Sequence, residues 1–135
     1  MNRLTRQQVI EFHRRLIDQY GGLHGIRNES LLDAALEAPF AAFGGQPLFP
    51  TVRERCGRLA FGIVANHPFN DGNKRIGVFA AFATLRLNGY SITSTPAEAT
   101  GFGMGLASGS INYQDALNWI QHHSIAPKIE HSYIG

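Results

Sequence analysis

Nine consecutive residues, 67–75, read His-Pro-Phe-Asn-Asp-Gly-Asn-Lys-Arg and bring together an imidazole, a carboxylate, a glycine, amides and two cations. Pro68 disfavours the helical backbone conformation at the residue before it, so a preceding helix is expected to end near Asn66. Apolar residues return at helical spacing from Ile76, which predicts a second helix that begins between residues 71 and 73. The polar residues are therefore expected to form a loop at the start of this second helix.

The first turn of a helix favours an anion because its backbone N–H groups have no intrahelical partners and because it carries the positive end of the helix dipole. Phosphate is the usual anion at such a position. Gly72 allows the backbone to approach a ligand closely, and Gly72 and Asn73 are expected to line the anion site. Lys74 and Arg75 add positive charge where a helix alone favours acidic residues, and a bound phosphate would remove this conflict.

Asp71 and His67 add two further kinds of chemistry. A carboxylate at position 71 would repel phosphate, but it suits Mg²⁺, which proteins hold with one or two carboxylates together with phosphate oxygens. Histidine changes its protonation near neutral pH and can act as a general base. Asp71 could instead cap the helix, and His67 could be a hydrogen-bonding residue at a helix end. We interpret the stretch as a phosphate and metal site beside a general base.

The order of these residues resembles the motif of the Fic/Doc family, His-x-Phe-x-Asp/Glu-Gly-Asn-x-Arg. The resemblance is closest to the Doc (death-on-curing) toxins, in which Lys follows Asn, as Lys74 does here. Fic proteins that transfer AMP have Gly at that place and a second Arg three residues after the first, where this chain has Val78. Gly72 is closer to the AMP-transferring motif, because Doc itself can have Ala there. Residues 21–39 are also similar to the opening of the Doc family.

The resemblance implies an all-α fold, a compact bundle of about six helices with the catalytic loop between the two central ones. It implies a transferase that uses ATP and Mg²⁺ to phosphorylate a Ser or Thr hydroxyl, with elongation factor Tu as the target and arrest of translation as the result. The implied catalytic base is His67, and the implied metal ligand is Asp71. The implied phosphate and nucleotide ligands are Gly72, Asn73, Lys74 and Arg75. Phe69 is expected to anchor the loop in the core, and Asn70 to face solvent.

Control of such a toxin could lie within the chain or outside it. Many Fic proteins carry an inhibitory helix with the pattern Ser/Thr-x-x-x-Glu-Gly/Asn, and the nearest match here runs from Ser94 to Glu98. Ala99 follows this match, and Thr95, Pro96 and Glu98 are better explained as a helix start. The resemblance therefore implies inhibition in trans by a small Phd-like antitoxin that folds on binding. Operator binding would belong to the antitoxin rather than to this chain.

Two other functions remain open at this point. The same His67 could transfer a nucleotidyl group, which the position of a label in ATP would distinguish from phosphorylation. Alternatively, the site could hold a nucleotide or a partner peptide without any reaction. The usual kinase and Walker motifs are missing from the sequence. The spacing between Arg58 and His67 is too long for a helical toxin ribonuclease with an Arg-x4–6-His motif.

Composition predicts one globular domain, residues 1–135, with 44% hydrophobic residues. A net charge of +2 is too small to indicate direct nucleic-acid binding. The single cysteine, Cys56, excludes an internal disulfide and a multi-cysteine zinc site, fits a reducing cytoplasm, and is expected to be a small buried hydrophobic residue. Neither a signal peptide nor a membrane span is predicted.

Helical spacing and end signals predict helices at residues 6–20, 29–38, 52–66, 73–87, from 96 onward, and 113–122. Three starts have the pattern of a capping box, with caps at Thr5, Thr51 and Thr95. The helix at 73–87 is apolar nearly all round, which predicts a central position. The helix from residue 96 contains Gly101, Gly103 and Gly105, and these are expected to allow close packing against the central helix.

Two segments are expected to be irregular. Residues 40–50 contain two glycines and two prolines and predict an exposed loop whose three phenylalanines, at positions 40, 43 and 49, could cover the core. The family resemblance implies that this segment is a flap that aligns the target protein beside the active site. Residues 124–135 have no periodicity and predict an irregular tail.

The histidines outside the motif are given structural roles. His122, His123 and His131 are expected to be solvated, because adjacent histidines on a terminal helix do not make a closed metal site by themselves. His13 lies beside the apolar stripe of the first helix and is expected to be a packing residue, with a ligand contact as the alternative.

Overall fold

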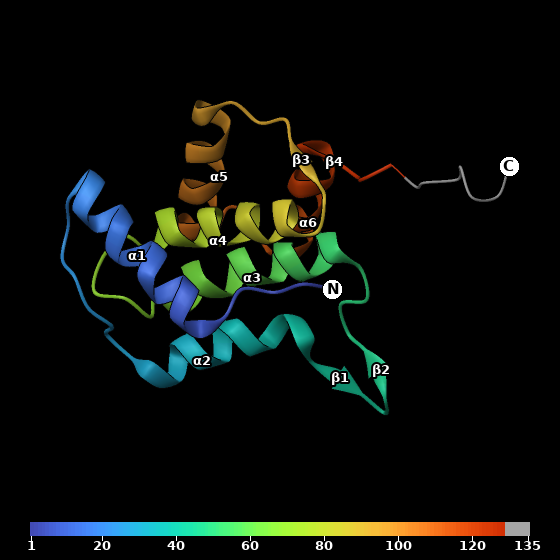
Figure 1. Cartoon of the computed structure of the whole chain (residues 1–135), viewed down its shortest axis with the longest axis horizontal. Coiled ribbons are helices and arrows are strands. Elements are labelled where there is room, and N and C mark those ends of the chain that lie inside the picture. Colours follow the sequence, from blue (N-terminus) through green and yellow to red (C-terminus); the bar gives the residue numbers. More distant parts are fainter. Residues whose placement is uncertain (129–135) are drawn as a thin grey trace, which may run out of the picture.

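Two antiparallel neighbours, α3 (Val52–Asn66) and α4 (Asn73–Leu87), form the middle of the molecule (Figure 1). The structure is a computed structural model that describes residues 1–128 of the chain. The other helices surround this pair and are α1 (Arg6–Tyr20), α2 (Glu29–Glu37), α5 (Pro96–Ser108) and α6 (Tyr113–His122). The predicted all-α fold of about six helices is therefore confirmed. The short elements are η1 (Ala38–Phe40), the hairpin of β1 (Ala42–Phe43) and β2 (Gln46–Pro47), and the antiparallel pair of β3 (Ser91–Ile92) and β4 (Ser124–Ile125).

Side-chain caps begin five of the six α-helices in the described part of the chain, and these caps are Thr5, Asn28, Thr51, Thr95 and Asn112. The predicted capping boxes at Thr5 and Thr95 are complete. At Thr51 the box is only half formed, because the side chain of Glu54 accepts from the Thr51 hydroxyl and not from the Thr51 backbone N–H. The exception is α4, whose N-cap is Gly72 and has no side-chain hydrogen bond.

Helix α4 is buried on both sides, as its sequence predicts. One core cluster lies toward α1 and α2 and includes Val9, Leu32 and Ile76, and the other lies toward α5 and α6 and includes Cys56 and Phe102. A Cβ atom at Gly77 would lie 2.7 Å from a methyl carbon of Val64, so glycine lets α3 and α4 pack closely. Burial raises the pKa of the Cys56 thiol to about 12, which confirms its reading as an inert buried residue.

Helix α5 packs against α4 through only one of its three glycines. A Cβ atom at Gly103 would contact the side chain and carbonyl of Lys74 and a methyl carbon of Val78. Gly101 faces open space, and Gly105 faces Ile111 in the connection to α6. The prediction that all three glycines serve packing on the central helix is therefore correct for Gly103 alone.

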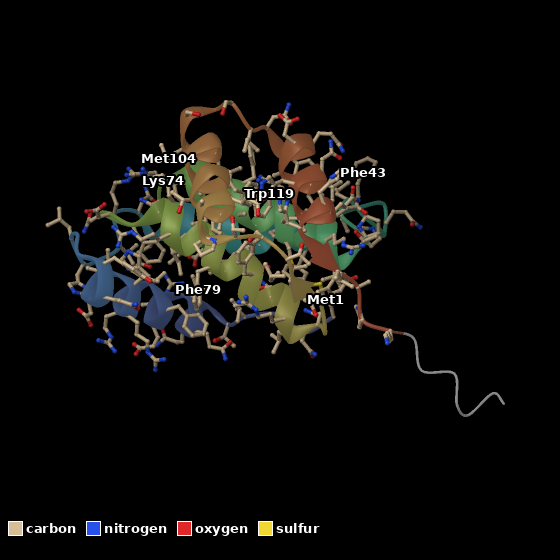
Figure 2. All side chains as sticks on the ribbon, turned by 90° about the horizontal axis from the view of Figure 1, so that it is seen from above. Met1, Phe43, Lys74, Phe79, Met104 and Trp119 are labelled. Atoms are coloured by element: carbon tan, nitrogen blue, oxygen red, sulfur yellow. The ribbon has the colours of Figure 1, made fainter. Side chains whose placement is uncertain are left out.

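The segment 40–50 begins with the last residue of η1 and forms the β1–β2 hairpin. It lies at the N-terminal end of α3, while the loop 67–72 lies at the other end of this helix (Figure 1). A 15-residue helix is about 22 Å long at about 1.5 Å per residue. Lys74 and Phe43 accordingly lie on opposite sides of the molecule (Figure 2). Phe40 and Phe49 are half-buried, but Phe43 is 82% exposed and covers no core. The expectation that this segment lies beside the active site is wrong.

The predicted irregular tail begins with an ordered strand. Ser124 and Ile125 pair with Ile92 and Ser91, and the Arg53 guanidinium donates to the hydroxyl and carbonyl oxygens of Ser124. The remainder of that tail from residue 129 on, with His131, lies outside the described residues. None of the described helices is long and apolar enough to cross a membrane.

The two histidines near the end of α6 differ in environment. His122 is exposed, as expected. His123 is not a solvated residue, because its ring stacks on Trp119 with 3.9 Å between ring centroids and its Nε2 lies 3.2 Å from the Glu98 carboxylate. Trp119 also stacks on Phe102, so this aromatic group joins α5 to α6 (Figure 2).

Candidate active site

Helix α3 ends at Asn66, and His67 follows in the left-handed conformation with φ of +52°. It is the one non-glycine residue with positive φ among the described residues. Such a conformation is uncommon for residues with a Cβ atom, and surrounding contacts have to maintain it. The carbonyl oxygen of His67 accepts a hydrogen bond from Arg27 Nε at 2.7 Å, and its N–H donates to Ile63 O at 3.1 Å. The imidazole is thus held by its backbone at the C-terminal end of α3, and the residue is exposed.

Asn73 holds the loop together from the first turn of α4. Its Oδ1 accepts from the Phe69 N–H and its Nδ2 donates to the Phe69 carbonyl, each at 3.0 Å. The same Nδ2 lies 3.1 Å from Nδ1 of His67. Asn73 is 5% exposed and Phe69 is 1% exposed, so the predicted anchoring of the loop by Phe69 is observed. The side chain of Asn73 has a structural task that sequence reasoning missed, since Asn73 was expected only to line the anion site.

The start of α4 has the backbone geometry expected of an anion site. Gly72 is left-handed with φ of +73°, and the first helical hydrogen bond runs from the Ile76 N–H to the Gly72 carbonyl. The N–H groups of Asn73, Lys74 and Arg75 precede this bond and have no intrahelical acceptor. Lys74 is exposed beside α5, near Met104 (Figure 2). The structure thus combines free N–H groups with a cation at the same helix end.

The Asp71 carboxylate lies directly before this helix start. Its Oδ1 accepts from the Gly72 N–H at 2.8 Å and its Oδ2 accepts from the Leu23 N–H at 3.2 Å. The hydrogen bond from Gly72, followed by that from Leu23, lowers the pKa of Asp71, so the group is ionised at neutral pH. Each oxygen keeps a lone pair for a cation.

No cluster of three His, Cys, Asp or Glu side chains within residues 1–128 could hold a metal ion. A cation at Asp71 would therefore be completed by ligand oxygens or water. This ligand set fits Mg²⁺, which typically binds to one or two carboxylates and to substrate phosphates.

Arg75 is tied to the end of α1. Its Nη1 donates to Gly21 O at 3.0 Å and to Leu16 O at 3.4 Å, and its guanidinium carbon lies 5.8 Å from the centroid of the Tyr20 ring. The side chain is half-buried. A phosphate contact by Arg75 would therefore use its other N–H groups or replace these two carbonyl acceptors.

Comparison with known proteins identifies the family of this chain. The family model described as "Fic/DOC family" matches residues 3–85, which include the 67–75 loop. The chain belongs to the Fic/DOC family.

Two curated relatives carry Doc names. The chain is 33% identical over 75 residues to "Toxin Doc" of Mycolicibacterium smegmatis, and this alignment covers 56% of the chain and 58% of that protein. It is 27% identical over 121 residues to "Protein kinase doc" of Escherichia phage P1, and this alignment covers 90% of the chain and 94% of the phage protein. Both are relatives of this Fic/DOC protein, one aligned over just over half of its length and the other over nearly all of it.

The segment that lies along the Fic/DOC motif is 21–28, between α1 and α2. Ile26 forms an antiparallel bridge with Phe69, and the Asn70 N–H donates to Gly25 O at 3.0 Å. The Asn70 side chain is exposed as predicted, but its Nδ2 donates to His24 O at 2.9 Å. We call residues 21–28 the strap.

Three glycines with positive φ shape the strap, Gly21, Gly22 and Gly25. A Cβ atom at Gly22 would lie 2.7 Å from Oδ2 of Asp71. Only glycine therefore allows the strap to lie this close to the carboxylate. The density of glycines in 21–25 is the sequence signal that could have drawn attention to this segment.

His13 supports the loop from α1. The residue is 3% exposed, and its ring lies parallel to that of Phe69 with 3.8 Å between centroids. Its Nε2 lies 2.8 Å from the carbonyl oxygen of Asp71. The interpretation of His13 as a packing residue is confirmed, and the hydrogen bond to the motif is an additional contact that the sequence did not predict.

An open cavity of about 460 Å³ lies on the α1 side of Phe69, next to the strap. Its walls include Ile10, Ile26, Asp18 and His24, and Nε2 of His24 lies 2.9 Å from Oδ1 of Asp18. None of residues 71–75 lines it. The predicted phosphate-binding residues therefore belong to the exposed start of α4 and not to this cavity.

Proposed function

We propose that this protein is a Doc-type toxin, an enzyme that transfers the γ-phosphate of ATP to a Ser or Thr hydroxyl of a protein in the presence of Mg²⁺. The observation that carries this proposal is the start of α4, where free N–H groups, the ionised Asp71 and the exposed His67 meet. The names of the two Doc relatives support a toxin and a protein kinase activity. The resemblance of the motif supports the same reaction class.

In the proposed reaction the phosphate oxygens bind to the N–H groups of Asn73 and Lys74, with the Lys74 and Arg75 cations nearby. His67 accepts the proton of the target hydroxyl while the hydroxyl oxygen attacks the γ-phosphorus. The bond from the γ-phosphorus to the bridging oxygen breaks, and ADP leaves with that electron pair. Asp71 would hold Mg²⁺, which supplies positive charge that stabilises the phosphate oxygens.

The contact between Asn73 and His67 means that the proton on the His67 ring has to move before His67 can act as the base. Asn73 Nδ2 donates to Nδ1 of His67, because Oδ1 of the same amide accepts from the Phe69 N–H. A neutral His67 therefore carries its proton on Nε2. Before Nε2 accepts a proton from the hydroxyl, its own proton has to leave or move to Nδ1, and substrate binding would have to favour that change.

Two residues favour transfer from the γ-phosphorus over transfer from the α-phosphorus. Lys74 occupies the place of the glycine of AMP-transferring Fic proteins. Val78 occupies the place of their second arginine. Its apolar side chain lies against Gly103 of α5 and supplies no positive charge to the site. Gly72 favours the alternative, nucleotidyl transfer by the same His67, since the AMP-transferring motif has glycine there.

The target and the partner are proposed from the family resemblance. The target is a translation protein, with elongation factor Tu as the first candidate, and its phosphorylation would arrest growth. Inhibition in trans would come from a small Phd-like antitoxin, and the toxin would act in the cytoplasm of a bacterium. The relatives' names, one called toxin and one from a phage, are consistent with such a pair.

A label-transfer assay tests the reaction. The purified protein, Mg²⁺ and purified elongation factor Tu or a bacterial lysate are incubated with ATP labelled at the γ- or the α-phosphate. His67→Ala is the test variant. His122→Ala is the matched control, because His122 is an exposed histidine on α6 whose side chain, among residues 1–128, bonds only its own helix, through the Asn118 carbonyl.

Transfer of the γ-label alone, lost in His67→Ala and kept in His122→Ala, is the expected result. Transfer of the α-label would identify a nucleotidyl transferase instead. Binding of ATP without transfer to either substrate preparation would favour a binding module, the third interpretation of the sequence.

A further inference from the structure

We propose that His13 is a positioning residue that fixes the Asp71 carboxylate at the metal site, an inference that rests on the proposed function of this site. His13 comes from α1, 58 residues before Asp71, and is 3% exposed. Its imidazole contacts two residues of the motif and lies beside a third. It stacks on Phe69, lies 2.8 Å from the carbonyl oxygen of Asp71, and would lie 3.6 Å from a Cβ atom at Gly72.

The hydrogen bond of His13 acts on a single peptide group. The carbonyl of this group belongs to Asp71 and accepts from His13 Nε2, and its N–H belongs to Gly72 and donates to the Asp71 carboxylate at 2.8 Å. A peptide group is planar, so fixing its carbonyl direction also fixes its N–H direction. His13 therefore sets the position of Oδ1 of Asp71 through one rigid unit.

No other described residue replaces His13 in this contact. The Asp71 carbonyl accepts no second hydrogen bond from residues 1–128. A carbonyl oxygen only accepts, so Nε2 of His13 carries a proton. The bond at Oδ2, from the Leu23 N–H, is the longer of the two at 3.2 Å, and it comes from the glycine-rich strap. The shorter bond to the carboxylate is the one from the Gly72 N–H, and His13 holds the peptide group that donates it.

The ring of His13 also fills the space beneath the loop. Its stacking on Phe69 has an interplanar angle of 12°. The backbone of Phe69 is fixed in turn by two hydrogen bonds with the Asn73 side chain, one donated by the Phe69 N–H and one accepted by its carbonyl. A substitution that keeps the volume of the His13 side chain but removes its N–H donor distinguishes the packing role of His13 from its role in positioning Asp71. His13→Met has no N–H group, while His13→Gln presents an amide N–H at a similar distance from the backbone.

The test measures Mg²⁺–ADP binding by calorimetry and amide hydrogen exchange by NMR, and it uses the full chain. His13→Met is expected to weaken Mg²⁺–ADP binding about tenfold or more, as loss of a group that orients a metal ligand usually does. Exchange of the Gly72 N–H should become faster in this variant, while exchange of buried amides of α6, such as that of Ile120, stays unchanged. His13→Gln should recover most of the affinity and of the protection at Gly72.

Unchanged affinity and unchanged exchange at Gly72 in His13→Met would overturn the proposal. Equal losses in the Met and Gln variants, or faster exchange throughout the chain, would also overturn it, because these results indicate a purely structural role. Asp71→Ala tests the proposed function independently of His13. If this variant binds Mg²⁺–ADP as tightly as the wild type, Asp71 is not a metal ligand. In that case, faster exchange confined to Gly72 would still support positioning of Asp71 by His13, and unchanged exchange would overturn it.

Discussion

The side-chain amide of Asn73 donates to Nδ1 of His67 across 3.1 Å and thereby selects the tautomer of the proposed catalytic histidine. The direction of this bond follows from the other end of the amide, since Oδ1 accepts from the Phe69 N–H. If Nδ1 of His67 carried a proton, it would face the Asn73 Nδ2 donor, and the hydrogen bond between the two side chains would be lost. In the free protein Nε2 of His67 is thus a hydrogen-bond donor. In this form it can donate to a phosphate oxygen but cannot accept a proton.

The tautomer can be measured directly. In the free protein at pH 8, we expect ¹⁵N NMR of the imidazole to show His67 with its proton on Nε2. Asn73→Asp should invert this pattern, because a carboxylate accepts the proton of Nδ1. A wild-type His67 with its proton on Nδ1 would contradict the role assigned to Asn73. His122 serves as an internal reference, since its Nδ1 lies 2.7 Å from the Asn118 carbonyl and must carry a proton.

Gly72 is predicted to be required both for its backbone angle and for space. Gly72→Ala places a Cβ atom 2.9 Å from a methyl carbon of the buried Ile17, in a residue with φ of +73°. Gly109→Ala is the matched control, because Gly109 has φ of +83° and no atom lies within 4 Å of the place that its Cβ atom would take. The left-handed conformation alone costs about 1–2 kcal/mol in a residue with a side chain.

We expect urea unfolding to show a loss of about 1–2 kcal/mol for Gly109→Ala and a clearly larger loss for Gly72→Ala. Equal losses in the two variants would show that Ile17 moves aside easily and that space at Gly72 is unimportant. The same two variants then separate stability from phosphate binding, since only Gly72 lies at the start of α4.

The helices could be predicted from the sequence because their signals are local. Thr5 with Gln8, and Thr95 with Pro96 and Glu98, lie within one turn of each other and fix the starts of α1 and α5. The chemical stretch was also predictable, since its nine residues are contiguous. The fold class follows from these elements because each of the six helices has an apolar face to bury.

The partners of the motif could not be predicted in the same way, because they lie far along the chain. His13 contacts Asp71 across 58 positions, and Leu23 contacts it across 48. A glycine-rich segment such as 21–25 has no periodicity that would place it against another element. The glycines and prolines of 40–50 predict a loop but not its place, and the length of α3 separates that segment from residue 67.

The link between α5 and the end of α6 is predicted to weaken in acid. The Thr95 N–H, together with the His123 ring, lowers the pKa of Glu98 below its usual value of about 4.3. A carboxyl whose pKa is lower in the folded state stabilises the fold above the unfolded pKa and loses this contribution as the pH falls through the folded pKa. Glu98→Gln should therefore lower the free energy of unfolding at pH 7, and the difference from the wild type should shrink as the pH falls below about 4.

Urea unfolding at several pH values checks this prediction. Glu37→Gln is a suitable control, because Glu37 is also an exposed glutamate with one cationic partner, Arg3, but its side chain makes no helix-capping hydrogen bond. A difference for Glu98→Gln that stays constant as the pH falls through the acid range would show that the charge of Glu98 contributes nothing.

Gly22 is predicted to be the residue that lets the strap lie close enough to bind Asp71. Gly22→Ala directs a Cβ atom to within 2.7 Å of Oδ2 of Asp71, so either the strap or the carboxylate has to move, and the bond from the Leu23 N–H is lost. The neighbouring Gly21 also has positive φ, at +87°, but has open space at its Cβ position. Gly21→Ala therefore carries the backbone strain without the contact to Asp71.

We expect Gly22→Ala to raise the Mg²⁺ concentration that gives half-maximal phosphoryl transfer by about tenfold, and Gly21→Ala to change it little. The free energy of unfolding, measured for both variants, corrects for the strain that they share. If the two variants lose activity in proportion to their stability alone, the strap serves the fold and not the carboxylate. If only Gly22→Ala changes the Mg²⁺ dependence, the close approach of the strap to Asp71 is part of the metal site, which explains why glycine stands at this position.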